Sequence, residues 1–270
     1  MSAGAPSIGG GVRYVGARVI DGVSEVGRVS LMMWDIIKSL GRLPSGRLIF
    51  EQMDRIGVGS LGLVVVISLF TGAVAAVQAA YQFSTVVPLR FLGSVILRSV
   101  IIELGPVLTA LVVGGRVGAA IAAELGSMKV TEQIDAMRAM GVNPVRYLII
   151  PRLIAATIML PVMTVFSDAI AIFGGFIVAI LTLGMTPPAY VNSLKDFFYM
   201  KDLVSGLIKA VFFGGFIGTM GCFYGFRTEG GAEGVGNATT RAVVASCVLV
   251  LISDYLLANV LFRIIFTDPH

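Results

Sequence analysis

The alternation of long apolar runs with short polar segments predicts a helical membrane protein with five spans. The runs lie at about 59–81, 99–123, 153–184, 203–226 and 242–262. Each is long enough to cross a bilayer as an α-helix, which needs about 20 apolar residues. The third run is longer than a straight span requires, so we expect it to tilt or to kink at Pro161. We therefore expect an all-α integral membrane protein whose membrane domain covers residues 59–270.

Residues 1–58 follow a different pattern, in which apolar and basic positions are interleaved. Seven arginines and lysines between Arg13 and Arg55 alternate with Val, Ile, Leu, Met and Trp34, and no uncharged run there reaches the length of a span. This pattern predicts amphipathic helices that lie in the membrane interface, with the basic side chains towards the lipid headgroups. A small soluble cap is the alternative for this segment.

A charged segment between the second and third runs predicts a helix over residues 127–141. Its apolar positions are spaced by 4, 3 and 3 and form one stripe over about four turns: Val130, Ile134, Met137 and Met140. The charged residues fall largely on the other faces: Lys129, Glu132, Asp135 and Arg138. Ser127 is the expected N-cap and Gly141 the expected residue after the C-cap. We expect this helix to couple the protein to a cytoplasmic partner; docking on its own protein or on lipid is the alternative.

Two further polar segments separate the later runs. Residues 186–202 predict a short amphipathic helix outside the bilayer, with Pro187 and Pro188 near its start. Residues 227–241 (RTEGGAEGVGNATTR) are polar and rich in glycine, and we expect a loop there.

Composition and charge agree with a membrane location and give an orientation. Hydrophobic residues make up 56% of the 270 residues and charged residues only 13%, against about 25% charged in soluble proteins. The net charge of +4 is too small and too dispersed to indicate nucleic acid as a partner. With the N-terminus inside, thirteen basic residues flank the spans on the cytoplasmic side and five on the other. The positive-inside rule therefore favours a cytoplasmic N-terminus.

The chemistry that the sequence excludes is as informative as what it offers. The single histidine is the last residue, His270, and both cysteines, Cys222 and Cys247, lie in apolar runs. We therefore expect no catalytic residue, no metal site and no disulfide framework. The chain has no G-x-x-x-x-G-K-[ST] phosphate loop, so we expect it to bind no cofactor itself. If ATP drives the protein, ATP and Mg²⁺ belong to a partner.

Every predicted span after the first carries an ionisable residue, and together they are Glu103, Arg116, Asp168, Lys209 and Asp254. A charge near the bilayer centre costs about 2.5–3.5 kcal/mol on insertion scales. We therefore expect Arg116 and Lys209 to pair with Asp254 and Asp168 inside the bundle, which leaves Glu103 free to face a cavity. Snorkelling of some of these side chains to the interface is the alternative.

Glu103 is also the first candidate for a binding cavity. It precedes Pro106 in a segment flanked by glycine, and broken helices at membrane depth survive where they line water or are covered by protein. Gln78, Tyr81 and Phe83, near the outer end of the first span, would form a mouth for acyl chains. An aromatic belt at the membrane interface is the alternative role for Tyr81.

The stretch ELGPVLTALVVGGRVGAAIAAELGSMKVTEQIDAMRAMGVNPVRYLIIPR, residues 103–152, closely resembles the MlaE/YrbE permease family. Members of this family are the membrane subunits of ABC systems that work with MCE-domain proteins to move lipids between membranes. The resemblance extends over about residues 59–262 and includes SGLIKAVFF at 205–213 and GVGNATTRAVV at 234–244. At one position the sequence departs from the pattern: some relatives carry Arg immediately before the glutamate, where this chain has Ile102.

The resemblance implies a homodimeric permease with an interfacial N-terminal helix and five spans in each subunit. It also implies a lipid cavity at the dimer interface and an elbow helix seated in a groove of the ABC ATPase. The expected location is the bacterial inner membrane, because the N-terminus lacks both the apolar core of a signal peptide and a transit peptide. Two other functions stay open: an ion-coupled transporter of an amphiphile, which the intramembrane carboxylates favour, and a membrane-embedded enzyme of lipid metabolism.

Overall fold

A computed structural model describes residues 8–41, 45–83 and 88–265, and it divides the chain into two units, residues 1–43 and 44–270. The described part of the first unit is one helix, α1 (Ile8–Leu40), where we expected several. Exposed apolar side chains recur along α1 at helical spacing: Ile20, Val23, Leu31, Trp34 and Ile37. The ammonium of Lys38 lies 5.4 Å from the centre of the Trp34 ring. An exposed apolar stripe of this kind suits a membrane interface, although that location stays a prediction.

The second unit is a bundle of long helices, and five helical stretches of its described residues are long and apolar enough to cross a membrane. The first, fourth and fifth are the single helices α2 (Gly46–Phe83), α8 (Met200–Phe226) and α9 (Gly231–Ile265). The second joins η1 (Leu89–Phe91), α3 (Leu92–Ser99), the π-helical turn η2 (Val100–Leu104) and α4 (Gly105–Val130). The third joins the π-helical turn η3 (Val145–Ile149) to α6 (Ile150–Leu181). The prediction of an all-α protein with five spans is confirmed.

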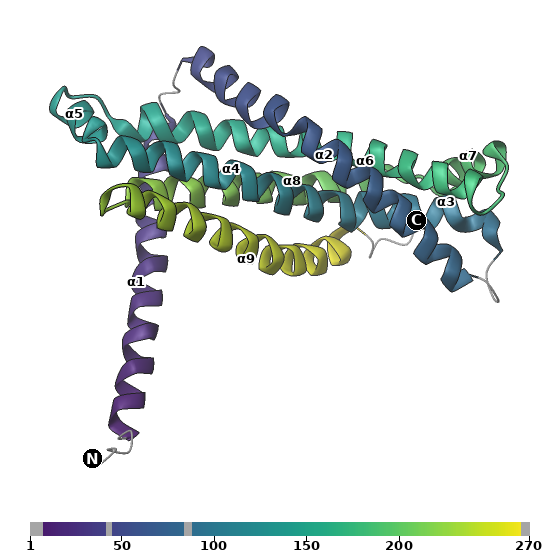
Figure 1. The fold of residues 1–270 in the computed structure, drawn as a ribbon, viewed down its shortest axis with the longest axis horizontal. Coiled ribbons are helices and arrows are strands. Elements are labelled where there is room, and N and C mark those ends of the chain that lie inside the picture. The colour runs from purple at the N-terminus through teal and green to yellow at the C-terminus, as the bar shows by residue number, and fades with distance from the viewer. Residues whose placement is uncertain (1–7, 42–44, 84–87, 266–270) are drawn as a thin grey trace. The chain divides into compact units, whose positions relative to one another are not determined.

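Two short helices mark the opposite ends of this bundle (Figure 1). α5 (Gln133–Ala139) lies at the end where α4 stops and α6 begins. α7 (Pro187–Asp196) lies at the other end, beside α3, and begins with two prolines as predicted. The side chain of Tyr190 in α7 is fully buried and its hydroxyl donates to the carbonyl of Ile172 at 3.1 Å. The amide of Ser94 in α3 donates to Ser193 Oγ at 2.9 Å, so α7 is anchored to both α3 and α6.

The helices extend further than the apolar runs. α2 begins at Gly46, so residues 46–58 belong to the helix of the first span rather than to the N-terminal segment. An i,i+4 ion pair of 3.0 Å between Glu51 and Arg55 supports this charged first part of α2. α9 begins at Gly231, so most of the loop expected at 227–241 is helical. Ala238 and Ala242 are buried there, and packing of this kind overrides the low helix propensity of the neighbouring glycines.

Glycines bring α2 and α6 into direct backbone contact. A Cβ atom at Gly72 would collide with the carbonyl of Ala171, and one at Gly174 would collide with the carbonyl of Leu69. About one turn before the contact of Gly72 with Ala171, the hydroxyls of Ser68 and Ser167 are 2.7 Å apart. Small residues of this kind allow van der Waals contact and interhelical hydrogen bonds, which hold helices together in lipid.

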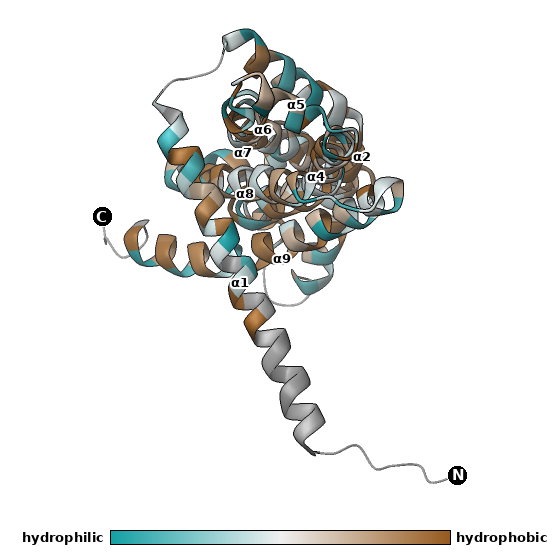
Figure 2. Ribbon diagram, turned by 90° about the vertical axis from the view of Figure 1, so that its left-hand side faces the viewer, coloured by the Kyte–Doolittle hydropathy of each residue, from teal (hydrophilic) through white to brown (hydrophobic). Residues whose placement is uncertain are grey.

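α9 is the least buried of the spans: 11% of its most apolar stretch is buried inside the bundle, against 56% for α8. Figure 2 shows apolar residues distributed along α9. Val248, Leu251, Ile252 and Tyr255 each expose roughly half or more of their surface. This surface must face lipid or another protein.

Candidate functional site

The segment between α4 and α6, which we call the elbow (residues 127–144), is not the single helix that the sequence predicts. α4 continues to Val130, a turn follows at Thr131 and Glu132, and α5 then spans only Gln133–Ala139. Glu132 adopts a left-handed conformation with φ 59°, the only positive φ of a non-glycine residue in the described chain. Ser127 therefore lies inside α4 and is not an N-cap. Sequence spacing could not show the break, because the same apolar spacing suits one long helix or two short ones.

The C-terminal end of α5 follows the prediction. Gly141 has φ 74°, its amide donates to the carbonyl of Arg138 at 3.0 Å, and the amide of Val142 donates to that of Met137 at 2.9 Å. These two hydrogen bonds form a Schellman motif, which satisfies carbonyls that the helix end leaves open. The chain therefore leaves α5 in a defined direction towards η3 and α6.

Side chains hold the elbow in one shape. Asp135 bridges the two short stretches, with Lys129 Nζ of α4 at 2.7 Å from its Oδ2 and an Arg138 amino group at 3.1 Å from its Oδ1. The Lys129 ammonium lowers the pKa of Asp135 below the usual 3.8, and Arg138 adds to this shift. Of the predicted apolar stripe only Ile134 is buried, whereas Met140 is 72% exposed. The elbow is thus fastened by Ile134 and the ion pairs, and it presents Glu132 and Met140 to solvent.

A network of ions behind the elbow ties three spans together, and the sequence did not reveal it. Glu124 of α4 pairs with Arg55 of α2 at 3.1 Å and with Arg152 of α6 at 3.0 Å. The Arg152 side chain is only 5% exposed and also donates to the carbonyl of Leu148 at 2.8 Å. The sequence pattern did not single out Glu124. No local pattern marks Glu124, because its partners are far away along the chain.

Lys209 is the centre of the second polar cluster, at membrane depth. Its side chain is 1% exposed, and its ammonium lies 2.6 Å from Glu103 Oε1 and 3.0 Å from Asp254 Oδ1. The cluster joins η2, α8 and α9. We expected Glu103 to be unpaired, and this prediction is wrong. Glu103 and Asp254 both pair with Lys209. The three residues carry one negative charge in excess if both carboxylates are ionised, and a pocket of about 380 Å³ beside them is lined by Tyr255, Asn259 and Phe262.

Arg116 and Asp168 do not join this cluster or each other. Arg116 donates to Ser60 Oγ at 2.7 Å and to the carbonyl of Arg55 at 3.5 Å. Asp168 is 5% exposed and lies against Gly105, and no basic group of the described residues is within ion-pair distance of it. Of the predicted pairings, that of Lys209 with Asp254 is present at 3.0 Å. Arg116 does not reach Asp168, because Arg116 lies about three turns along α4 from Gly105, the residue against which Asp168 packs.

The four residues predicted for a lipid cavity do not share one pocket within the chain. Gln78 lines a groove of about 630 Å³ between α2 and α4, together with Phe70, Val74, Leu104 and Leu108. Glu103 lines the pocket beside Lys209 instead. The Tyr81 side chain is 84% exposed, and Phe83 packs on the buried cluster around α3 and α6. Whether these residues contact lipid stays a prediction.

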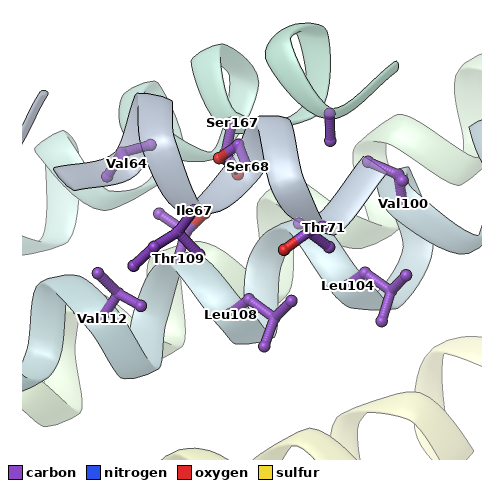
Figure 3. A pocket seen from close by; sticks show the side chains of 12 residues that line it. Val64, Ile67, Ser68, Thr71, Val100, Leu104, Leu108, Thr109, Val112 and Ser167 are labelled. Carbon is purple, nitrogen blue, oxygen red and sulfur yellow. Dashed lines mark hydrogen bonds between the residues drawn. The ribbon is translucent and has the colours of Figure 1, made fainter. Parts of the chain in front are cut away.

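A small internal pocket adjoins the Gln78 groove and shares its wall (Figure 3). The two hollows have four lining residues in common: Ile67, Thr71, Leu104 and Leu108. Figure 3 shows Ser68 and Ser167 side by side, across the pocket from Leu104 at the end of η2 and Leu108 on α4. The seam between α2 and α4 is therefore loosely packed over much of its length, whereas the contact between α2 and α6 is close.

The chain matches the family model described as permease MlaE over residues 49–260. It is 41% identical over 251 residues to a probable ABC transporter permease protein of Rickettsia typhi, covering 93% of this chain and 97% of that protein.

Two further relatives carry more specific names. The intermembrane phospholipid transport system permease protein MlaE of Haemophilus influenzae is 34% identical over 256 residues, which cover 93% of this chain and 97% of that protein. The chloroplastic protein TRIGALACTOSYLDIACYLGLYCEROL 1 of Arabidopsis thaliana is 37% identical over 213 residues, which cover 79% of this chain and 61% of that protein. With five spans, a charged elbow and a family match that covers most of its length, the chain belongs to the MlaE permease family.

Proposed function

We propose that this chain is the permease subunit of an ABC transporter that moves phospholipid-like lipids between two membranes. The observation that carries the proposal is the family match, together with the name of the Haemophilus influenzae relative as an intermembrane phospholipid transport permease. The apolar groove between α2 and α4 supports it, because a groove of about 630 Å³ lined by Phe70, Val74 and Leu104 has the size and character to hold part of an acyl chain. The bacterial inner membrane, with the elbow on the cytoplasmic side, is the proposed location.

An ABC ATPase is the proposed source of energy, and the elbow is its proposed docking point. The sequence has no phosphate-binding loop of the Walker type, so ATP and Mg²⁺ would bind to the partner. The elbow supports this role because it is charged, exposed at Glu132 and Met140, and rigidly braced by Asp135. Lys129, Met137 and Arg138 complete the proposed coupling surface.

Force applied to α5 has a direct path into the bundle. The ion pair of Asp135 with Lys129 connects α5 to the end of α4. The Schellman motif at the end of α5 leads the chain towards the start of α6. Just behind it, Glu124 ties α4 to α2 through Arg55 and to α6 through Arg152. Closure of two ATPase subunits would therefore move α2, α4 and α6 of each subunit together and squeeze the lipid cavity between the two permease subunits.

A homodimer and an MCE-domain partner complete the proposal. The open apolar surface of α9 supports a second copy of the chain, because an exposed face of this size on a helix with so little burial is covered by lipid or by protein. Gln78, Tyr81 and Glu103, which lie apart within one chain, would then contribute to a lipid cavity at the interface between subunits. The MCE-domain protein would bind on the side of the membrane where α7 lies, opposite the ATPase.

The test is to purify the tagged chain, identify what copurifies, and measure ATP hydrolysis and lipid transfer in proteoliposomes. Two variants separate the backbone of the elbow from its charge: Glu132→Gly suits the left-handed φ but removes the carboxylate, and Glu132→Gln keeps the size of the side chain. If Glu132 contacts the ATPase, both variants hydrolyse ATP without transferring lipid. Asp196→Asn, an exposed change in α7, is the matched control and should transfer lipid normally. Normal transfer by both Glu132 variants would contradict the coupling role of Glu132.

A second candidate function is ion-coupled transport of an amphiphile. The specific observation in its favour is the set of carboxylates at membrane depth: Glu103 and Asp254 at Lys209, and Asp168 without a basic partner among the described residues. This function predicts lipid movement in proteoliposomes that contain the chain alone and are driven by a pH or sodium gradient. Transfer that requires an ATPase and ATP would exclude it.

A further inference from the structure

Arg116 stands apart from the other arginines that contact the spans. Arg55, Arg98 and Arg152 each pair with a carboxylate at 3.0–3.1 Å. Among the described residues, Arg116 contacts only the neutral oxygens of Ser60 and of the Arg55 backbone. An arginine at membrane depth without a counter-charge is costly, so it is expected to snorkel towards an interface or to meet an anion.

The direction in which Arg116 reaches is clear from its contacts. Its hydrogen bonds run to Ser60 and to the carbonyl of Arg55, and the Arg55 side chain pairs with Glu124, two turns beyond Arg116 along α4. The guanidinium therefore reaches towards the elbow end of the bundle. A Cβ atom at Gly59 would collide with it, so the missing side chain at Gly59 makes room for the guanidinium on α2.

The Arg116 guanidinium lies in a groove of about 470 Å³ between α2 and α4. Arg55 and Glu124 line the same groove, as do apolar or small positions such as Val58, Gly59 and Ala120. Glu124 is already paired with both Arg55 and Arg152, and the Arg55 side chain also pairs with Glu51. Asp54 also lines the groove and is exposed. Arg116 is the cation of this groove that has no carboxylate partner among the described residues.

Beyond Arg116 the same seam becomes apolar. One turn further along α4, Val112 lines the small internal pocket with Val64 and Ile67 of α2, and that pocket shares its wall with the Gln78 groove. A molecule with an anionic group at Arg116 and a hydrocarbon chain along this seam would match both chemistries. A free phosphate would match only the first.

We propose that the groove at Arg116 is a second lipid site, which binds the phosphate of a membrane phospholipid while an acyl chain follows the seam between α2 and α4 towards Leu104 and Leu108. The phosphate would lie at the elbow end of the membrane, away from the predicted mouth at Tyr81, and the acyl chain would run towards the groove that Gln78 lines. The site extends the proposed function, since it would let lipid enter or leave the permease laterally from the leaflet on the ATPase side. Charge-assisted hydrogen bonds from an arginine to a phosphate are among the stronger and more selective polar contacts.

The test uses the full chain purified in detergent, with the photoreactive residue p-benzoylphenylalanine in place of Ala120, which lines the groove. The chain is irradiated with dioleoyl phosphatidylglycerol, and the lipid adduct is measured by intact mass spectrometry. Arg116→Gln should reduce the adduct about tenfold, because it removes the charge-assisted hydrogen bonds to the phosphate. Arg116→Lys, which keeps the charge, should retain most of it. Arg90→Gln, at the opposite end of the bundle, is the matched control and should change nothing.

Two further arms identify the source of the phosphate. Dioleoylglycerol has the same chains without the phosphate and should give little adduct. Excess inorganic phosphate should leave the phosphatidylglycerol adduct intact; if it abolishes the adduct, the site takes free phosphate and the proposal fails. It also fails if Arg116→Gln, shown to be folded by its melting temperature, labels as strongly as the unchanged arginine.

This result is separable from the proposed function, because the labelling needs neither ATP nor an ATPase. Arg116-dependent labelling in a chain that shows no ATP-driven transfer would keep the lipid site and reject the transporter role. ATP-driven transfer, with labelling that does not depend on Arg116, would keep the transporter role and reject the lipid site.

Discussion

At the scale of single residues, Lys209 is a buried cation that two carboxylates share. It is fully buried and is shared by Glu103 and Asp254, which come from two other helical segments. The desolvation of such a cluster is offset only while all three groups remain, since removal of one partner of a buried pair leaves an uncompensated charge. Pairs of neighbouring charges are therefore expected to behave non-additively.

Lys209→Met should destabilise the protein by about 3–5 kcal/mol, because it leaves two carboxylates together at membrane depth. The triple variant Lys209→Met, Glu103→Gln, Asp254→Asn should recover most of this loss, since it removes all the charges at once. Thermal unfolding in detergent measures both effects. Equal melting temperatures for the single and the triple variants would show that the three groups are not coupled.

Asp135 gives a prediction about pH outside the membrane. Lys129 and Arg138 lower its pKa below 3.8, so its ion pairs stabilise the elbow above that pH and are lost only as the pH falls through the lowered pKa. Asp135→Asn should therefore increase amide hydrogen exchange in 133–139 to the same extent at pH 5.5 and pH 8. A difference between variant and unchanged protein that disappears at pH 5.5 would mean that Asp135 is already protonated there.

At the scale of elements, the pairing of α2 with α6 depends on glycine. The carbonyls of Ala171 and Leu69 occupy the space that side chains at Gly72 and Gly174 would need, and a backbone carbonyl cannot move aside as a flexible side chain can. The two helices therefore approach more closely than side chains would allow. The seam between α2 and α4 lacks such contacts, and the grooves lie along that seam.

Gly72→Ala should destabilise the bundle by about 1–3 kcal/mol, the usual cost of overpacking. Gly62→Ala lies in the same helix with nothing within 4 Å of the new Cβ, so it should be neutral or slightly stabilising. Melting temperatures of the two variants in one detergent provide the comparison. A similar effect of both changes would show that helix propensity, and not close packing, sets the cost.

At the scale of the whole molecule, the asymmetry of basic residues gives a topology that can be tested directly. Thirteen basic residues on the elbow side against five on the α7 side favour a cytoplasmic elbow. The structure adds that α5 and α7 lie at opposite ends of the bundle (Figure 1). The two native cysteines lie in the spans and can be replaced first.

Asn192→Cys in α7 should react with a membrane-impermeant maleimide added to intact spheroplasts. Ala136→Cys in α5 should react only after the membrane is opened, because the elbow faces the cytoplasm. Both positions are exposed, so a failure to react reflects sidedness and not burial. Labelling of Ala136→Cys in intact spheroplasts would invert the proposed orientation and place the ATPase surface on the wrong side.

The sequence by itself determined the class of the protein, its five spans, the short helix with Pro187 and Pro188 at its start, and the helix end at Gly141 in the elbow. These follow from local physics: a bilayer requires about 20 apolar residues in each helix, and glycine readily takes a positive φ. The sequence pattern did not predict that residues 46–58 and 231–241 are helical. Helices continue through charged or glycine-rich segments when packing or ion pairs support them.

Only the tertiary structure decided which charges meet. The placement and rotation of helices that are far apart in sequence determine these contacts. Glu103 pairs with Lys209, and Arg116 contacts only neutral oxygens among the described residues. Glu124 pairs with Arg55 and Arg152. The break at Glu132, where φ is 59°, is likewise a feature that the spacing of apolar residues does not show. Spacing along a chain specifies the faces of a helix, but the partner of each face is fixed only when the helices pack.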